Sequence, residues 1–336
     1  MKNDGYIGIL DPLRGIAALA VVFFHYSGSL LPSIEPNALT HFFSRGNLGV
    51  HAFFVISGYV IPYSLWRANY RLGKYGWFML RRWARIAPPA YLAAMAMIVL
   101  NHLSILRSGT PIAGSGYPGL DAVPFLANLT FTVPYFGEGW YNFVYWTLTI
   151  EFEFYLLIGL LYPLLRRDKP VKLYALLIGM LALVFIPGPN FFQFAPFFLL
   201  GLFIHLYRIG ILDGKACMIL LAMACGLASW SEGPGAAAVG AASAAVIFLY
   251  KASIPHWLAW LGVISYSLYI THVPVGIASE FLVKQLIPAP GEIGKVLLLF
   301  LYTFIALMAA WGFNVLVERP THQLARHIGG KRWRSK

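Results

Sequence analysis

Long apolar runs, one after another, are the feature that most limits what this chain can fold into. A transmembrane helix needs ~20 mostly apolar residues, and the sequence contains about ten such runs. Only 11% of the 336 residues are charged, against about 25% in a soluble domain, so the chain cannot cover itself with a water-compatible surface. In lipid the backbone must satisfy its own hydrogen bonds, as helices do. We therefore predict an all-α integral membrane protein with about ten transmembrane helices.

The predicted spans follow one another with polar connections between them. They cover residues 9–31, 47–66, 83–102, 142–165, 172–187, 191–207, 216–232, 234–250, 257–277 and 294–317. Residues 119–136 are apolar too, but they contain two prolines and an aspartate, so we expect an interfacial or re-entrant segment there. We expect one membrane domain over 1–336, with its transmembrane core at about 9–317 and a basic cytoplasmic tail at 318–336.

The basic residues predict the orientation of the spans. Of the 25 lysines and arginines, Arg14 lies within a span and twenty fall in segments on the side of the N-terminus. The other side has four, at Arg45, Arg107, Lys284 and Lys295. Cytoplasmic loops carry the excess of Lys and Arg, so we predict that both termini are cytoplasmic. The net charge of +12 then reflects topology, and we expect no nucleic-acid partner.

Ionisable residues inside predicted spans are the first candidates for function, because each is costly in a bilayer unless it is paired or hydrated. Arg14 and His25 are eleven residues apart in the first span, which is three helical turns plus ~20°. Both therefore lie on one helix face, ~16 Å apart along the axis. Alternatively, Arg14 snorkels to the inner interface and His25 bonds a neighbouring helix. The spacing alone leaves both interpretations open.

Three further spans carry other candidate residues. Glu151 and Glu153 are ~200° apart around a helix, so at most one of them can face the same site as His25, and a structural role for both is the alternative. His272 ends a polar stretch, SYSLYITH (265–272), near the outer end of the ninth span, where it is either interfacial or functional. His205, near the inner end of its span, is expected to be interfacial.

Arg82 and Arg85 lie in RRWARIAPP (81–89), a segment that we expect to be the loop entering the third span. They are three residues apart and share a helical face at the cytoplasmic boundary. The positive-inside rule alone explains their presence there, whereas guanidinium groups are also well suited to clamp a phosphate.

Cys217 and Cys225 fit neither a disulfide framework nor zinc-ligand spacing, so we expect them to pack in the core and expect no metal.

Several of these segments together resemble the acyltransferase-3 family of bacterial membrane O-acyltransferases. Arg14 and His25 are similar to the family's arginine and histidine separated by ten residues, and Arg82 and Arg85 to its arginine-x-x-arginine. The other matching segments are GVHAFFVISGYVI (49–61), WTLTIEFEFYLL (146–157, with Glu151 at the glutamate position), SYSLYITH (265–272) and VERP (317–320). His51 departs from the pattern, because relatives more often carry an acidic residue there. The chain also resembles a stand-alone membrane form without an appended hydrolase-like domain.

The resemblance implies an enzyme that moves an acyl group, most often acetyl, from cytoplasmic acyl-CoA to a hydroxyl of a surface polysaccharide, a lipid-linked glycan or a related glycoside. It implies a multi-pass protein of the bacterial inner membrane. Arg14, Arg82 and Arg85 are then expected to bind acyl-CoA. His25, as an imidazole with an unperturbed pKa of ~6.5, would be the general base, and Glu151 would orient it.

Three residues are expected on the acceptor or oxyanion side, namely His272, Tyr269 and Glu153. Direct transfer is favoured over an acyl-enzyme, although an acyl-histidine at His25 is the alternative. A different class of function also fits buried Arg, His and Glu residues: a transporter or flippase for a glycan or lipid-linked sugar.

Overall fold

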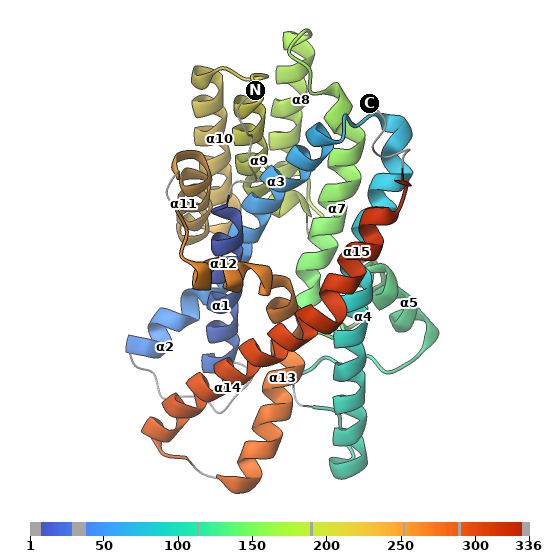
Figure 1. Cartoon of the computed structure of the whole chain (residues 1–336), viewed down its shortest axis with the longest axis vertical. Helices are drawn as coiled ribbons and strands as arrows, with labels where there is room; N and C mark the ends of the chain where they lie inside the picture. The colour runs from blue at the N-terminus through green and yellow to red at the C-terminus, as the bar shows by residue number, and fades with distance from the viewer. Residues whose placement is uncertain are drawn as a thin grey trace.

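The computed structural model describes residues 8–28, 38–112, 114–188, 191–250, 253–287 and 290–330. Within these ranges every regular element is helical (Figure 1), which confirms the predicted all-α class. Elements labelled η are short 3-10 turns, except η6, which is a π-helical turn. In chain order the elements are α1 (Leu10–Gly28), α2 (Ala38–Phe43), η1 (Ser44–Leu48), α3 (Gly49–Arg67), η2 (Leu72–Lys74), α4 (Tyr75–Ser108), α5 (Ala122–Thr130), α6 (Val133–Phe136), η3 (Phe143–Tyr145), α7 (Trp146–Leu161), η4 (Tyr162–Leu164), α8 (Pro170–Ala182), η5 (Leu183–Phe185), α9 (Phe191–Arg208), α10 (Gly214–Glu232), α11 (Pro234–Leu249), α12 (His256–Val263), α13 (Ser265–Leu286), α14 (Glu292–Phe313), η6 (Asn314–Glu318) and α15 (Arg319–His327).

Each predicted span contains at least one long or medium helix, but fewer of them are long and apolar enough to cross a membrane by themselves. Among the described residues, six helical segments are long and apolar enough, and α12 with α13 makes a seventh if the pair is one bent span. The six are Leu39–Arg67, Leu72–Ser108, Phe143–Leu164, Phe191–Arg208, Gly214–Glu232 and Glu292–His327. The protein is therefore an all-α chain with several membrane-spanning helices, and the number ten stays a prediction.

The segments that fall short have identifiable causes. The apolar run of α1 is interrupted by Asp11, Arg14 and His25, while the helical segments Pro170–Phe185 and Pro234–Leu249 are apolar but short. Residues 119–136 form only the short helices α5 and α6, as expected for a segment that does not cross. Residues 29–31 of the first predicted span, Lys2, Lys251 and the tail beyond residue 330 lie outside the described residues.

Two predicted boundaries are wrong. α4 begins at Tyr75, so RRWARIAPP is the interior of a helix and not a loop; leucine and arginine are good helix formers, and they extend the helix beyond its apolar part. α4 ends at Ser108 and is capped by Gly109, which adopts the left-handed φ of 76° that glycine tolerates. The ninth predicted span is also not continuous, because α12 and α13 meet at an angle of 64° around Ile264.

Glycines allow two helix pairs to approach closely. A Cβ on Gly58 of α3 would lie 1.9 Å from the carbonyl oxygen of Phe198 in α9. At the second crossing, a Cβ on Gly262 of α12 would lie 2.1 Å from the carbonyl oxygen of Asp11, and one on Gly15 of α1 would lie 2.8 Å from the Gly262 nitrogen. Small residues let helix backbones pack against each other in lipid. The second crossing fixes the position of α1, and with it Arg14.

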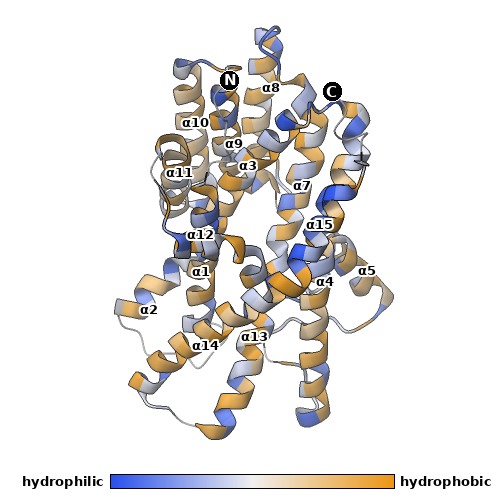
Figure 2. Ribbon diagram, viewed as in Figure 1, coloured by the Kyte–Doolittle hydropathy of each residue, from blue (hydrophilic) through white to orange (hydrophobic). Residues whose placement is uncertain are grey.

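The basic connections gather at one end of the molecule. Figure 1 shows the α3–α4, α7–α8 and α9–α10 connections together at the end that is uppermost in the view, and Figure 2 shows hydrophilic residues there. Their basic residues include Arg67, Arg71, Lys74, Arg166, Arg167, Lys169 and Lys215. The α13–α14 connection and the end of α4 lie at the opposite end. These three connections, all predicted to be cytoplasmic, therefore share one end of the fold.

Candidate functional site

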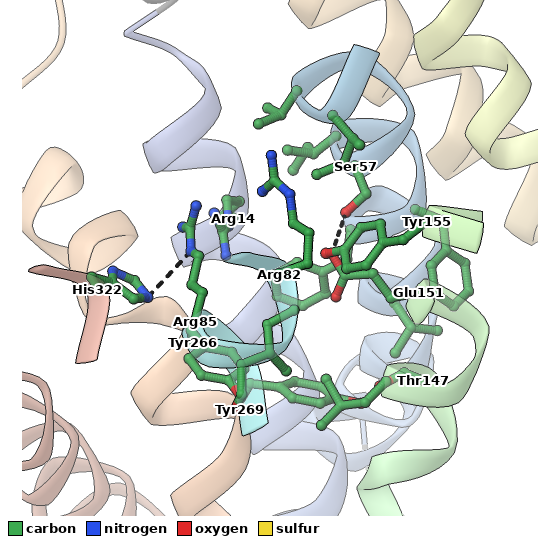
Figure 3. A pocket seen from close by; sticks show the side chains of 18 residues that line it. Arg14, Ser57, Arg82, Arg85, Thr147, Glu151, Tyr155, Tyr266, Tyr269 and His322 are labelled. Atoms are coloured by element: carbon green, nitrogen blue, oxygen red, sulfur yellow. Dashed lines mark hydrogen bonds between the residues drawn. The ribbon is translucent and has the colours of Figure 1, made fainter. Parts of the chain in front are cut away.

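A pocket of about 860 Å³ lies between six helices, α1, α3, α4, α7, α13 and α15. Arg14, Arg82 and Arg85 all line it, and the charged carboxylate among the described lining residues is Glu151. Figure 3 shows the three arginines on one side and Glu151 with its partners on the other. We call this the arginine pocket. Three guanidinium groups against one carboxylate leave an excess of positive charge, which is costly in a helix bundle unless an anion compensates it.

Hydrogen bonds hold two of these arginines in the pocket. Arg82 donates from Nη2 to Oγ of Ser64 at 2.6 Å. Arg85 donates from Nε to Nε2 of His322 at 3.2 Å, so α15, far along the chain, supplies part of the wall. The structure therefore brings together all three residues that were predicted to bind the donor, from α1 and α4.

Glu151 is the glutamate of the predicted pair that faces the pocket. Its carboxylate accepts a hydrogen bond from the Ser57 hydroxyl of α3 at 3.0 Å and another from the Tyr155 hydroxyl, one turn away on α7. The wall of phenylalanine and tyrosine rings around it thus has a single acidic group, held by two hydroxyls. The hydrogen bonds of this carboxylate in the described part of the chain do not include His25, so the structure does not form the predicted Glu151–His25 pair.

Glu153 has a different environment from Glu151 although it is two residues away. It accepts a hydrogen bond from the hydroxyl of Tyr135 in α6 and one from the backbone N–H of Phe191, at 3.0 Å, where α9 begins. Burial, together with the bond to Glu153, raises the pKa of Tyr135 to about 12, so this hydroxyl remains a donor at neutral pH. Glu153 is not among the residues that line the arginine pocket, and its contacts join α6 and α9 to α7.

His25 and His272 lie side by side between α1 and α13. Their ring centroids are 5.3 Å apart, and the Phe143 ring lies 5.1 Å from His25. The Tyr26 hydroxyl donates to the backbone oxygen of His272 at 2.5 Å, which fastens the two helices at this level. Neither histidine is among the residues that line the arginine pocket.

One ring nitrogen of His272 is oriented by the backbone and the other has no partner. Nδ1 lies 2.7 Å from the Tyr269 carbonyl oxygen and 3.2 Å from that of Leu268, which makes Nδ1 the protonated nitrogen. Nε2 is buried and has no hydrogen-bond partner among the residues that the structure describes; in this tautomer it is an acceptor. An unsatisfied buried acceptor costs ~1–3 kcal/mol, and a bound hydroxyl would satisfy it.

Tyr269 connects the histidine pair to the arginine pocket. Its hydroxyl lies 2.8 Å from Oγ1 of Thr147 and 3.1 Å from the Val144 carbonyl oxygen. Tyr269 is also one of the residues that line the arginine pocket. Its ring centroid is 6.0 Å from that of His272. The two groups of predicted residues are therefore neighbours that share one tyrosine.

Sequence reasoning noted Glu318 as an ionisable residue at the inner boundary of the last span but did not predict its contacts. Glu318, in the π-helical turn η6, accepts hydrogen bonds from Ser267 at 2.5 Å and from Asn314 at 2.8 Å. Its other oxygen lies 3.6 Å from Nε2 of His322. The i, i+4 spacing of Glu318 and His322 was the available signal, but both follow the last apolar run, where only a basic tail was expected.

Two other histidines lie away from this site. His205, expected to be interfacial, is fully buried, with Nε2 3.2 Å from the Tyr162 hydroxyl, so it faces neighbouring helices instead of the membrane surface. His51 lies 3.3 Å from Glu232 of α10.

Cys217 and Cys225 are free thiols, and in the described ranges no group of three or more His, Cys, Asp or Glu side chains is placed to hold a metal.

Comparisons with known proteins agree on one kind of chemistry. Residues 7–315 match a family model described as an acyltransferase domain, Acyl_transf_3. The chain is similar to O-acetyltransferase OatA of Staphylococcus aureus strain NCTC 8325 / PS 47, at 30% identity over 178 residues, which are 51% of this chain and 27% of the relative. OatA of strain COL matches to the same extent. The match thus spans about a quarter of the length of these curated relatives. No solved structure matches.

Proposed function

We propose, given that this chain belongs to the acyltransferase-3 family, that it is a membrane O-acyltransferase which moves an acyl group, acetyl in the first instance, from acyl-CoA to a hydroxyl of a glycan or glycoside. The observation that carries the proposal is the arginine pocket, where Arg14, Arg82 and Arg85 surround a buried space. Acyl-CoA is an anion with a long uncharged arm that ends in the thioester. It suits a pocket that is positively charged at one end and lined by aromatic and hydroxyl groups at the other.

The phosphates would lie against Arg82 and Arg85, because guanidinium forks bind phosphate oxygens in pairs. The uncharged arm would then extend past Glu151 towards Tyr269 and the histidine pair. Glu151 has Ser57 and Tyr155 as partners, so we assign it to shaping this passage and to balancing part of the arginine charge. This replaces its expected role of orienting His25.

Transfer would take place at His25 and His272. His25 removes the proton of the acceptor hydroxyl, and the oxygen attacks the thioester carbonyl carbon. The C–S bond then breaks, and the thiolate leaves with the proton that His25 holds, so the enzyme returns to its starting state. General-base assistance of this kind contributes roughly 10²- to 10⁴-fold. Nε2 of His272, which has no hydrogen-bond partner among the described residues, would accept a hydrogen bond from a second hydroxyl of the acceptor and so orient it.

The same proposal includes the topology. Ten crossings, with both termini cytoplasmic in the bacterial inner membrane, put the basic connections on the side where acyl-CoA is made. They also bring the arginine pocket to that side. The acceptor would reach the histidine pair from the other side, where surface glycans are assembled. The relatives' name, O-acetyltransferase, supports acetyl as the group and a hydroxyl as its destination.

The direct test is a deletion strain complemented with the wild-type gene or with His25→Ala, in which O-acyl groups on isolated surface glycans are measured by proton NMR. We expect acyl signals that disappear on deletion and return with the wild type alone. Unchanged acylation in all three strains would contradict the proposal for glycan acceptors. A loss of glycan export without any change in acylation of the remaining glycan would favour the transporter or flippase alternative instead.

A further inference from the structure

The arginine pocket continues into two further cavities. The middle cavity, of about 690 Å³, shares Arg82, Arg85 and His322 with the arginine pocket. The third, which we call the outer cavity, has a volume of about 1340 Å³ and shares Ser64, Arg81 and Arg326 with the middle one. Because neighbouring cavities share lining residues, the three lie in a row from Tyr269 to the α3–α4 connection, at the basic end of the molecule.

The outer cavity is positively charged in its own right. Arg67 at the end of α3, Arg81 of α4 and Arg326 of α15 line it from three different helices, together with Ser64 and Asn69. Every charged residue that the structure describes in this lining is an arginine. Arg81 also donates from Nη2 to the backbone oxygen of Arg326 at 3.0 Å, which holds α15 against α4 at the cavity.

The arginines extend along the whole row of cavities. Arg14 lines only the arginine pocket and Arg67 only the outer cavity, and the middle cavity between them is lined by Arg81, Arg82, Arg85 and Arg326. A ligand with a single anionic centre would leave the arginines at one end of the row uncompensated. The arrangement fits an extended ligand with two anionic centres, and acyl-CoA has two: the diphosphate next to the pantetheine arm and the phosphomonoester on the ribose.

We propose that the outer cavity is a subsite for the ribose phosphomonoester of the donor, with Arg67 and Arg326 as its specificity-determining residues. This inference rests on the proposed function and adds to it which part of the donor each arginine group recognises. A phosphomonoester carries close to two negative charges at neutral pH, so it should gain most from arginines on several sides. Ser64 and Asn69 offer hydrogen bonds to the neighbouring sugar hydroxyl.

The test compares two probes that differ only at that group, CoA and 3′-dephospho-CoA, in direct binding to the purified full-length protein in lipid nanodiscs. Hydrogen bonds to charged groups are strong enough that we expect CoA to bind roughly tenfold or more tightly. In Arg67→Gln and Arg326→Gln the ratio of the two dissociation constants should fall towards one. Arg81 is left unchanged, because its bond to the Arg326 backbone also positions α15.

Arg107→Gln is the matched control, since Arg107 is a basic residue at the far end of α4 whose guanidinium lies over the Phe281 ring. It should keep the wild-type ratio. Equal binding of the two probes by the wild type would overturn the inference while leaving the donor proposal intact. No binding of CoA at all would overturn the donor proposal itself. Variants that weaken both probes equally would also contradict the subsite, because they would show a general effect of charge.

Discussion

Nε of Arg85 donates a hydrogen bond to Nε2 of His322 across 3.2 Å, although the two residues are 237 positions apart in the chain. The same ring nitrogen lies 3.6 Å from the carboxylate of Glu318. Because this nitrogen accepts the hydrogen bond from the guanidinium, it cannot donate one to the carboxylate at the same time. His322 is therefore the residue of α15 that orients Arg85 in the arginine pocket.

We predict that His322→Ala raises the KM for acyl-CoA several-fold and changes kcat less, because Arg85 loses the partner that orients it. His322→Gln should recover part of the loss, since its amide oxygen can accept the same hydrogen bond. Steady-state kinetics with varied acyl-CoA distinguish the two parameters. A fall in kcat at unchanged KM would contradict a positioning role through Arg85.

Replacing the two arginines of α4 tests the arginine pocket. Arg82→Gln and Arg85→Gln should each raise the KM for acyl-CoA roughly tenfold or more, because each loses a charge-assisted contact to a phosphate. Arg107→Gln, on the same helix, should leave it unchanged. If only the affinity for the acceptor changed in the first two variants, the assignment of the pocket to the donor would be wrong.

His25→Ala should reduce transfer by roughly 10²- to 10⁴-fold, the usual contribution of a general base, while CoA still binds with wild-type affinity. The separation of the histidine pair from the arginine pocket is the reason for expecting binding to survive. Transfer assays and CoA titrations on the same preparation provide the rate of transfer and the dissociation constant for CoA. Normal turnover in this variant would exclude His25 as the base.

Glu151 and Glu153 provide a matched pair on one helix. Glu151→Gln should lower kcat/KM for acyl-CoA, because the carboxylate lines the arginine pocket and balances its charge. Glu153→Gln should lower thermal stability, on the order of 1 kcal/mol, through its contacts with Tyr135 and Phe191, and leave the kinetics nearly intact. A thermal unfolding curve and a kinetic assay for each variant complete the comparison. The reverse pattern would show that the helix face was assigned wrongly.

Two exposed positions test the topology in a Cys217→Ser, Cys225→Ser background. Thr110→Cys, after the end of α4, should react with a membrane-impermeant maleimide in spheroplasts. Asp168→Cys, in the α7–α8 connection, should react only after the membrane is permeabilised. Labelling of both positions from the outside would rule out the predicted orientation.

The sequence predicted well which segments are helical, but it predicted poorly where some helices begin and where they bend. Apolar runs locate α3, α9 and α14 because burial in lipid requires long uncharged stretches. The same signal placed the start of α4 too late, since RRWAR lowers local hydropathy without weakening the helix. Hydropathy also could not show the 64° bend at Ile264, because it records how apolar a segment is and not the direction in which the helix continues.

The candidate site was predictable where residues are close in sequence or match a family motif. Arg14, Arg82 and Arg85 were expected to act together, and they line one pocket. Angular spacing showed that only one of Glu151 and Glu153 could face a common site, but it could not say which. His322 and Ser57 were missed because their contacts with Arg85 and Glu151 depend on how distant helices pack, which no local pattern records.

The crossing of α1 and α12 at Gly15 and Gly262 has a consequence for genetics. Neither glycine has a side chain to offer a ligand, yet each sits where even a methyl group would push apart the helix that carries Arg14. In a screen of random variants for loss of acylation, both codons should therefore be recovered as often as those of the chemically active residues. The glycine alleles would differ in one respect: a compensating change in the opposite helix could restore them, whereas repacking a helix cannot restore a lost general base.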